Sequence, residues 1–344
     1  MKFDVVVGNP PYQDENVGKN NQAVPVYNYF YDLAEKVAEE YCLISPARFL
    51  SNQGATPKSW NKKMLSDQHI EIKYFNSKSA DVFPGVDIKG GVVVLYRNKK
   101  ELYDAIDTFI PFEELRSIFH KVKKVNEDSI SGLVYSPDSY RFTDILFDEE
   151  PELKERTDAS HAKAVASSVF SRYPEIFFDE KPKDNEDYIR IYGRSSGERV
   201  YKFIKRKYIN PHPNLDKWKV ILPGANGTGA FGEALSTPII GEPGVGHNQT
   251  FVSIGNFDSE FEAESLLKYI KTKFGRSMLG IMKTTQNNQS KNTWSKVPLQ
   301  NFDEASSEID WSKTVSEVDS QLYQKYSLSE KEIDFIESNV KSMD

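Results

Sequence analysis

Cysteine and histidine are scarce in this sequence of 344 residues, which has Cys42 as its only cysteine and five histidines. A single thiol excludes internal disulfides and any metal site built from several thiolates. None of the histidines stands in an H-E-x-x-H pattern, so the sequence gives no indication of a zinc site. A lone cysteine is typical of a reducing compartment, and we expect a cytoplasmic protein.

Long apolar runs are also lacking. No stretch approaches the roughly 20 apolar residues that a membrane-spanning helix needs. The N-terminus lacks the charged and then apolar segments of a secretory signal. The 38% hydrophobic and 28% charged residues are instead typical of a soluble globular protein, and the length predicts two domains.

The net charge of −7 argues at first against a nucleic-acid partner, but the charges are unevenly distributed. Residues 266–299 contain basic residues and no acidic one, and residues 199–219 contain several basic residues against Asp216 alone. Basic runs separated in this way can attract a polyanion in spite of a negative total. The alternative explanation for both runs is a set of solvated helix faces.

The first residues predict a buried strand that ends in a stiff turn. Three valines after an aromatic residue in the segment 3–8 are typical of a strand in a parallel sheet covered on both faces. In Asn9-Pro10-Pro11-Tyr12, each proline fixes its own φ and restricts the residue before it. The Asn9 side chain and the backbone carbonyls can then face a ligand beside the Tyr12 ring. This arrangement suits a planar molecule that carries an amino group.

The rest of the first half predicts part of a doubly wound α/β sheet. A helical pattern over 27–40 followed by a strand over 41–46 completes a β-α-β unit, and hence a parallel pair. Strands over 70–75 and 91–97 lack a helix-length connection. We therefore expect the last strand to be antiparallel.

The second half predicts an α+β region. Residues 102–120 have a helical pattern, and strands are expected at 218–223 and 250–254. Ser-x-x-Glu capping boxes predict helices that begin after Ser259 and Ser329.

The Asn9-Pro10-Pro11-Tyr12 turn resembles the Asp/Asn/Ser-Pro-Pro-Tyr/Phe motif of amino-methyltransferases that act on DNA bases. Further segments strengthen this resemblance, namely 43–50, 82–91, 248–251, Trp294 and 297–300. Together they resemble the catalytic and C-terminal parts of N6-adenine methyltransferases of restriction–modification systems, in particular type IIG enzymes, in which a nuclease is fused to the methyltransferase.

This resemblance implies a chemistry for the motif. The Asn9 side-chain oxygen and the Pro10 carbonyl would accept the hydrogens of the adenine amine, which localises its lone pair for attack on the methyl group of S-adenosylmethionine. The base must be flipped out of the duplex. Tyr12 would stack on it, and Phe83 matches the aromatic residue that contacts the flipped base in relatives. The alternatives are a strand-ending turn for the motif and a core aromatic for Phe83.

The resemblance also implies a domain organisation and a double-stranded DNA partner. Residues 1–115 would form a partial catalytic domain, 116–302 a target-recognition domain and 303–344 a helical segment. Basic side chains would contact phosphates, and amide side chains would read base edges. The candidate phosphate contacts are Lys89, Lys205, Arg206, Lys207, Lys271, Lys273, Arg276, Lys283 and Lys291, and the candidate adenine readers are Gln286, Asn287, Asn288 and Gln289. For any single one of these residues, exposure to solvent alone is the alternative.

Residues 227–232 form a G-x-G-x-x-G pattern directly after the strand over 218–223. A phosphate-binding loop of this kind should open a helix, but Pro238 and Pro243 interrupt the chain soon afterwards. No acidic residue closes a second strand about 20 residues on, as ribose binding requires. We therefore expect this loop to belong to the specificity region and not to bind the cofactor.

The sequence departs from the family in one respect. A glycine-rich cofactor segment normally precedes the catalytic motif by many residues, whereas eight residues precede Asn9 here. We therefore expect the S-adenosylmethionine-binding segment to lie outside this chain, and an upstream methyltransferase or nuclease half is the candidate partner that would carry it. Two other hypotheses remain: a non-catalytic, sequence-specific DNA-binding module, and a self-sufficient enzyme that uses the glycine loop.

Overall fold

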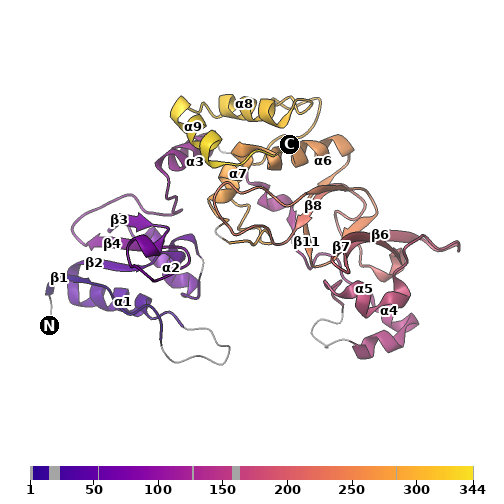
Figure 1. Ribbon diagram of the computed structural model, residues 1–344, viewed down its shortest axis with the longest axis horizontal. Helices are drawn as coiled ribbons and strands as arrows, with labels where there is room; N and C mark the ends of the chain where they lie inside the picture. Colours follow the sequence, from indigo (N-terminus) through magenta and orange to yellow (C-terminus); the bar gives the residue numbers. More distant parts are fainter. Residues whose placement is uncertain are drawn as a thin grey trace. The chain divides into compact units, whose positions relative to one another are not determined.

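The computed structural model describes residues 3–14, 24–52, 54–125, 128–156, 163–283 and 285–343 (Figure 1). The chain divides into two compact units, residues 1–112 and 113–344. Within the described ranges, the first unit holds a sheet of four strands, and the second holds sheets of three and four strands. The mixed α/β class is therefore as predicted.

The first unit is built on a sheet with a parallel and an antiparallel part. Its elements are β1 (Phe3–Gly8), α1 (Tyr27–Val37), β2 (Ala38–Pro46), the 3-10 turn η1 (Arg48–Ser51), α2 (Lys58–Ser66), β3 (Ile70–Asn76), the 3-10 turn η2 (Ser79–Asp81) and β4 (Val92–Asn98). The strand order is β1-β2-β4-β3. β1 and β2 are parallel and are joined through α1, which confirms the β-α-β unit. β4 is antiparallel to β2 and β3, which confirms the antiparallel pair.

The core of the first unit lies on one face of this sheet. Tyr41, Leu43, Val93 and Leu95 point to this face and belong to one buried cluster with side chains of α1 and α2. The hydroxyl of Tyr31 in α1 donates to the Leu43 carbonyl oxygen at 3.2 Å. This contact fastens α1 to the carboxyl end of β2, the end that positions the candidate site.

β1 is not the doubly covered strand that its valines predict. Among the described residues β1 pairs with β2 alone, so it lies at the edge of the sheet. Phe3, Val5 and Val7 are 51%, 48% and 71% exposed. They point away from the buried cluster, to which only the alternate residue Val6 adds a contact. An apolar strand with an open edge and an open face is typical of a surface that another segment covers.

The second unit begins with α3 (Glu113–Val125), so the helix predicted over 102–120 starts 11 residues later than expected. Pro111 gives the reason, because proline lacks an N–H and disfavours helical conformation in the residue before it. Asp107 adopts a left-handed conformation with a φ of 50°, which also excludes a regular helix.

Two sheets organise the second unit. The three-stranded sheet has the order β10-β6-β7, and the four-stranded sheet has the order β5-β11-β8-β9. The strands are β5 (Val134–Tyr135), β6 (Tyr188–Ser195), β7 (Glu198–Lys205), β8 (Trp218–Pro223), β9 (Ile239–Gly241), β10 (Val245–His247) and β11 (Phe251–Phe257). β8 has the predicted bounds, and β11 continues the strand predicted over 250–254 by three residues.

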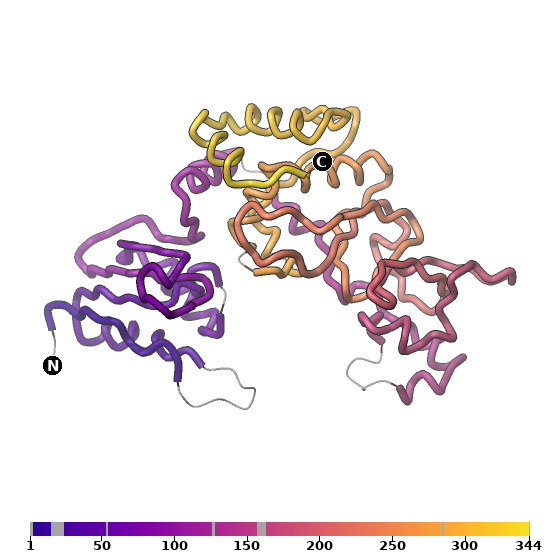
Figure 2. The backbone as a smooth tube through the Cα atoms, in the orientation of Figure 1, coloured from indigo at the N-terminus to yellow at the C-terminus, as the bar shows by residue number. Residues whose placement is uncertain are grey.

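The described helices of the second unit fall into two groups. α4 (Asp144–Glu149) and α5 (Val169–Arg172) precede the three-stranded sheet, and α5 contacts β6. The others, α6 (Glu260–Lys271), α7 (Lys273–Gly280), α8 (Val315–Lys325) and α9 (Glu330–Asn339), pack against one another and against α3. The capping boxes at Ser259 and Ser329 are confirmed, and Thr314 forms a third. α8 contacts α6 and α7, and α9 contacts α3 and α7, so residues 303–343 lie within this unit (Figure 2). No helix in the described ranges is long and apolar enough to cross a membrane.

Candidate functional site

Three segments of the first unit meet at one edge of its sheet. Gly8, the last residue of β1, pairs with Leu43 of β2, so the turn at 9–12 emerges beside the carboxyl end of β2. β4 runs the opposite way, and its first residue Val92 pairs with Pro46. The loop that leads into β4 and carries Phe83 therefore lies at the same edge as the Asn9–Tyr12 turn. In open α/β sheets this edge, at the carboxyl ends of parallel strands, is where ligands bind.

The Asn9–Tyr12 turn is fixed by the segment that leads into α1. The Tyr12 carbonyl oxygen accepts a hydrogen bond from the Val26 N–H at 3.2 Å, and the next two residues continue this antiparallel contact. Pro10 is buried, whereas Asn9 and Pro11 are exposed. The structure thus presents the Asn9 side chain to solvent on a backbone that is held from both sides.

The Tyr12 hydroxyl lies close to the Asn9 side chain. Its oxygen is buried and forms no hydrogen bond with the described residues. Burial raises the pKa of Tyr12, and the nearby Asn9 side chain opposes this shift. A buried hydroxyl without a partner costs on the order of 1–3 kcal/mol. It is therefore a position at which a ligand can make a hydrogen bond.

Phe83 stands on a loop with internal bracing. The hydroxyl of Ser79, a residue 3% exposed, donates to the Val86 carbonyl oxygen at 2.8 Å and accepts from the Ile88 N–H at 2.6 Å. Gly91 ends the loop with a φ of +78°, and a Cβ there would lie 2.1 Å from the Asn76 carbonyl oxygen, so only glycine fits. Phe83 itself is half-buried.

The start of η1 is tied to the same loop. The Ala47 N–H donates to the Gly91 carbonyl oxygen at 3.0 Å, and Arg48 Nε donates to the Lys89 carbonyl oxygen at 2.5 Å. Lys89 has an exposed side chain at this edge. In the sequence, Arg48 was noted only within the segment 43–50 that resembles the methyltransferase family. Its place beside the Asn9–Tyr12 turn was not predicted. The available signal was that it is the first charged residue after β2.

Three predicted DNA contacts of the second unit are interior residues, which corrects that expectation. Arg276 is 2% exposed and donates to the backbone carbonyl oxygens of Lys271 and Lys341; burial lowers its pKa to about 10. Lys283 is 6% exposed and forms an ion pair within the unit. Asn288 is fully buried and donates to the Pro223 carbonyl oxygen at 3.3 Å. These side chains hold loops together and do not face a polyanion.

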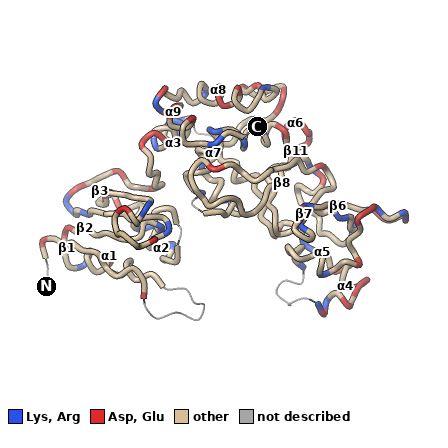
Figure 3. The backbone as a smooth tube through the Cα atoms, in the orientation of Figure 1, with Lys and Arg blue, Asp and Glu red and all other residues tan. Residues whose placement is uncertain are grey.

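Other basic candidates are paired with acidic residues from distant parts of the sequence. The pairs are Lys205 with Glu186 at 3.2 Å, Arg206 with Asp187 at 2.6 Å and Asp216 at 2.8 Å, Lys207 with Glu149 at 2.7 Å, and Lys273 with Glu337 at 2.5 Å. Figure 3 shows basic and acidic residues intermixed around β6 and β7. The run over 199–219 is therefore basic in sequence but does not form a patch of one sign in space.

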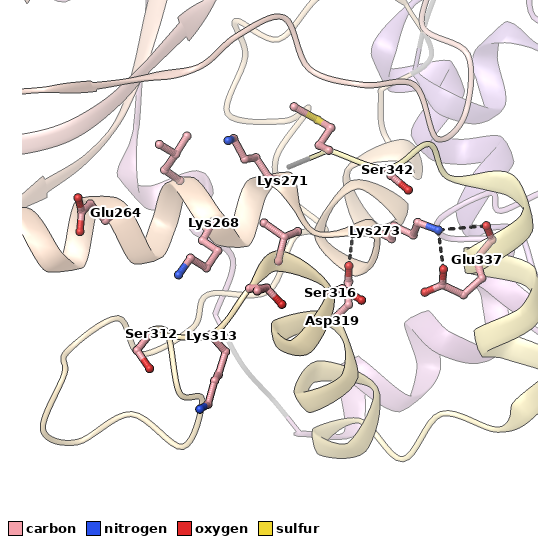
Figure 4. Close-up of a pocket in the computed structure, with 14 residues that line it drawn as sticks. Glu264, Lys268, Lys271, Lys273, Ser312, Lys313, Ser316, Asp319, Glu337 and Ser342 are labelled. Atoms are coloured by element: carbon pink, nitrogen blue, oxygen red, sulfur yellow. Dashed lines mark hydrogen bonds and ion pairs between the residues drawn. The ribbon is translucent and has the colours of Figure 1, made fainter.

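The remaining candidates fall on two surfaces of the second unit. Lys271 lines a groove of about 770 Å³ between α6 and the start of α8, which also contains Lys268, Glu264 and Asp319 (Figure 4). Figure 4 shows Lys273 turned toward Glu337 in this groove. Its lining has both charge signs. Gln286, Asn287 and Lys291 are exposed and lie together on the segment after α7, while Gln289 is half-buried.

The glycine loop after β8 binds a carboxylate of the chain itself. The Glu233 side chain accepts hydrogen bonds from the N–H groups of Thr228 at 2.9 Å and Gly229 at 3.0 Å. Lys283 Nζ lies 2.5 Å from the same carboxylate. These N–H groups are the ones that would cradle a phosphate, and no helix follows the loop. The loop therefore does not provide a nucleotide-binding site.

The glycine loop instead holds the amide-rich segment that follows α7. The Asn226 N–H donates to the Gln286 carbonyl oxygen at 2.7 Å, and the Asn288 N–H donates to the Gly224 carbonyl oxygen at 2.9 Å. A Cβ on Gly229 would lie 2.4 Å from the Thr285 backbone, so glycine is required for this close approach. The backbone of 285–288 is thereby fixed while the Gln286 and Asn287 side chains stay exposed.

Comparison with known proteins agrees with this geometry. Residues 1–83 match the family described as Eco57I restriction-modification methylase. The N-terminal part of the chain is therefore similar to the methylases of this family. The match contains the Asn9–Tyr12 turn, Arg48 and Phe83, and it confirms the resemblance to restriction–modification adenine methyltransferases.

Individual relatives extend this comparison. An uncharacterized adenine-specific methylase of Mycoplasma pneumoniae is 35% identical over 97 residues, which are 27% of this chain and 22% of the relative. The type IIL restriction-modification enzyme MmeI, solved in complex with DNA, aligns with a TM-score of 0.41 and 10% identity. The type IIG restriction endonuclease BpuSI aligns with a TM-score of 0.35 and 11% identity. This chain is covered to 98% in both alignments but spans only 56% and 54% of those two proteins.

Proposed function

We propose that this chain is a component of a site-specific DNA adenine-N6 methyltransferase of a restriction–modification system, and that S-adenosylmethionine is the methyl donor. The observation that carries the proposal is the meeting of the Asn9–Tyr12 turn and the Phe83 loop at one edge of a sheet, within the residues that match the Eco57I family.

In this proposal the chain holds a flipped adenine. The Asn9 side-chain oxygen and the Pro10 carbonyl oxygen accept hydrogen bonds from the exocyclic amine and localise the nitrogen lone pair. The rings of Tyr12 and Phe83 stack on the base, which offsets part of the cost of removing it from the duplex. The buried Tyr12 hydroxyl, which lacks a partner among the described residues, supplies a further polar contact at this position.

The described residues do not fit S-adenosylmethionine. The glycine loop at 227–232 is filled by Glu233. At the sheet edge of the first unit, the turn after β1 consists of Asn9, two prolines and Tyr12 and offers no glycine-rich cradle. This chain therefore contributes the adenine side of the reaction, and the cofactor would be held by another polypeptide segment.

The open side of β1 is the surface on which that segment would dock. β1 has an unpaired edge among the described residues, and Phe3, Val5 and Val7 are exposed beside it. Burying one such side chain completely contributes about 1.5–3 kcal/mol. A strand of that segment could pair with the open edge of β1, and a helix could cover these three side chains. The sheet would then continue past β1.

A DNA-binding specificity module without catalytic activity is the second candidate. It is favoured by the fixed backbone of 285–288, which exposes two amide side chains next to Lys291. Amide groups can read adenine in the major groove, and a neighbouring lysine can contact phosphate.

One comparison separates the two candidates. Transfer of labelled methyl groups to DNA is measured for residues 1–344 alone and for the chain expressed with any coding sequence that lies directly upstream of it in its genome (the extended protein). We expect no cofactor binding by residues 1–344 in calorimetry, and transfer only by the extended protein. Loss of transfer in Asn9→Ala would support the enzyme. Sequence-specific binding without transfer in either protein would favour the specificity module.

A further inference from the structure

Arg48 is held at the rim of the candidate adenine site. It is the first residue of η1 and follows the carboxyl end of β2, the strand next to β1. Its Nε donates to the Lys89 carbonyl oxygen at 2.5 Å. A Cβ on Gly90 would lie 2.9 Å from Arg48 Cγ, and a Cβ on Gly54 would lie 3.4 Å from Arg48 Cβ. The aliphatic stem thus passes between two glycines, and these contacts restrict where the guanidinium can lie.

No acidic residue neutralises this guanidinium in the described ranges of the first unit. Its neighbour Tyr27 is a neutral phenol, whose pKa burial raises to about 12 while a hydrogen bond with Thr56 and the Arg48 charge oppose the shift. Two other cations of the same unit are paired: Arg97 contacts Asp67 at 2.9 Å, and Lys63 contacts Glu35 at 2.5 Å. With Nε bound to a carbonyl, the two terminal nitrogens of Arg48 remain as donors.

We propose that Arg48 binds a phosphate of the DNA strand that carries the flipped adenine, with Lys89 as a second cation at the same rim. This inference rests on the proposed function and adds a binding residue to it. Neighbouring strands lie about 4.8 Å apart, so Arg48 is one strand away from the Asn9–Tyr12 turn. A side chain as long as arginine, one strand away from the turn, would be close to the sugar-phosphate backbone of a base held at Asn9.

The geometry favours a DNA phosphate over the carboxylate of a cofactor. Arg48 lies on the β2 and β4 side of the motif and is bonded to the loop that carries Phe83. The open edge of β1, where the cofactor segment would dock, is on the other side of the motif. A planar guanidinium can bind phosphate with two parallel hydrogen bonds, and such contacts fix the register of a protein on DNA.

The test measures how DNA binding depends on salt. Residues 1–344 are titrated by fluorescence anisotropy with a duplex in which the target adenine stands opposite an abasic site, over a range of salt concentrations. Loss of one phosphate contact should reduce the slope of log K against log salt by about 0.9. We expect this reduction in Arg48→Met, which keeps the aliphatic stem, and a smaller loss of affinity in Arg48→Lys. Lys36→Met, an exposed lysine of α1, is the matched control and should keep the wild-type slope.

The outcomes separate this inference from the proposed function. An unchanged slope in Arg48→Met, with thermal unfolding like that of the wild type, would overturn the phosphate contact and leave the proposed function standing. Failure of the wild-type chain to bind any duplex, both alone and in the extended protein, would overturn both. If Arg48→Met unfolds, the Arg48→Lys variant serves instead. A folded Arg48→Lys variant with the wild-type DNA affinity and the wild-type salt slope would count against the inference. If Arg48→Met leaves the salt dependence of DNA binding unchanged but weakens cofactor binding in the extended protein, Arg48 would bind the cofactor carboxylate and not a DNA phosphate.

Discussion

Glu233 and Lys283 form a buried ion pair, with Lys283 Nζ 2.5 Å from Glu233 Oε1 and with side chains that are 14% and 4% exposed. Glu233 also accepts two backbone N–H groups of the glycine loop, and Lys283 donates to the Asn226 carbonyl oxygen at 3.1 Å. Burial opposes the ionisation of Glu233, but the hydrogen bonds from Lys283, Thr228 and Gly229 outweigh it and lower its pKa. This pair explains why a loop with a nucleotide-binding pattern has a structural role.

We expect Lys283→Met to destabilise the second unit, because it leaves the Glu233 carboxylate buried without its cation. Removing one partner of a buried pair costs roughly 3–5 kcal/mol. Urea unfolding at neutral pH measures the loss. Lys291→Met, which changes an exposed lysine of the neighbouring segment, should alter the free energy of unfolding by less than about 0.5 kcal/mol. Equal stability of the two variants would contradict the structural role of the pair.

The Glu332 carboxylate predicts a pH-dependent contribution to stability. Burial opposes its ionisation, but Lys121 Nζ at 2.6 Å and the Ser329 N–H at 2.6 Å prevail and lower its pKa to about 2 from an ordinary value of 4.5. Because the folded-state pKa is lowered, the contribution is complete above pH 4.5 and is lost as the pH falls toward 2. Glu332→Gln should cost roughly 1.5–3 kcal/mol at pH 7. In urea unfolding, the difference in the free energy of unfolding between this variant and the wild type should be smaller at pH 3 than at pH 7. The same difference at both pH values would contradict a stabilising role of the ionised Glu332.

The elements of the first unit could be largely predicted from the sequence, because their patterns are local. The valines of β1, the amphipathic α1 and the short connection between β3 and β4 determine a parallel and an antiparallel pair without knowledge of distant residues. β2 nevertheless begins at Ala38 and not at Tyr41, since Ala38 and Glu40 pair with Phe3 and Val5. The sequence pattern of these residues is helical, and it gives no sign that they pair with β1.

The electrostatics of the second unit could not be predicted from the sequence, because ion pairs join residues far apart in it. Lys207 pairs with Glu149, and Arg276 bonds to carbonyl oxygens as distant as that of Lys341. A run without acidic residues therefore indicated DNA contacts where the structure has buried or paired cations. The Glu233 carboxylate directly follows the glycine pattern, but only the fold shows that it turns back into the loop.

Tyr12→Phe tests the unpartnered hydroxyl. The hydroxyl makes no hydrogen bond in the described part of the chain, so its removal should leave the melting temperature unchanged or raise it slightly. If a bound base uses this hydroxyl, the same variant should weaken binding to a duplex with an extrahelical adenine. Calorimetry and anisotropy give the two quantities. A clear loss of stability would show that the hydroxyl has a structural partner.

Phe83→Ala tests stacking on the flipped base. Stacking of a base on an aromatic side chain contributes about 1–3 kcal/mol, so the affinity for a duplex with an extrahelical adenine should fall roughly 5- to 150-fold. Phe112→Ala, a partly exposed aromatic residue at the end of the first unit, serves as the control and should not change this affinity. An equal effect of both substitutions would point to general destabilisation and not to stacking.

The exposed amides of the second unit predict a division of roles. Gln286→Ala should change the preferred base at one position of the DNA site, with a loss of about 1–3 kcal/mol for the preferred sequence. Lys291→Ala should weaken binding to all sequences alike and reduce the salt dependence. Selection of bound duplexes from a random pool distinguishes the two effects. An unchanged selected sequence in Gln286→Ala and Asn287→Ala would remove this segment from base recognition.

The role of the Asn9–Tyr12 turn is tested by the amount of N6-methyladenine in DNA, measured by mass spectrometry in cells that express the chain together with any coding sequence that lies directly upstream of it. We predict N6-methyladenine with the wild-type sequence and a reduction of at least about 100-fold in Asn9→Ala, because the oxygen that holds the adenine amine is removed. Unchanged methylation in an Asn9→Ala protein expressed at the same level would contradict the claim that this turn holds the target base.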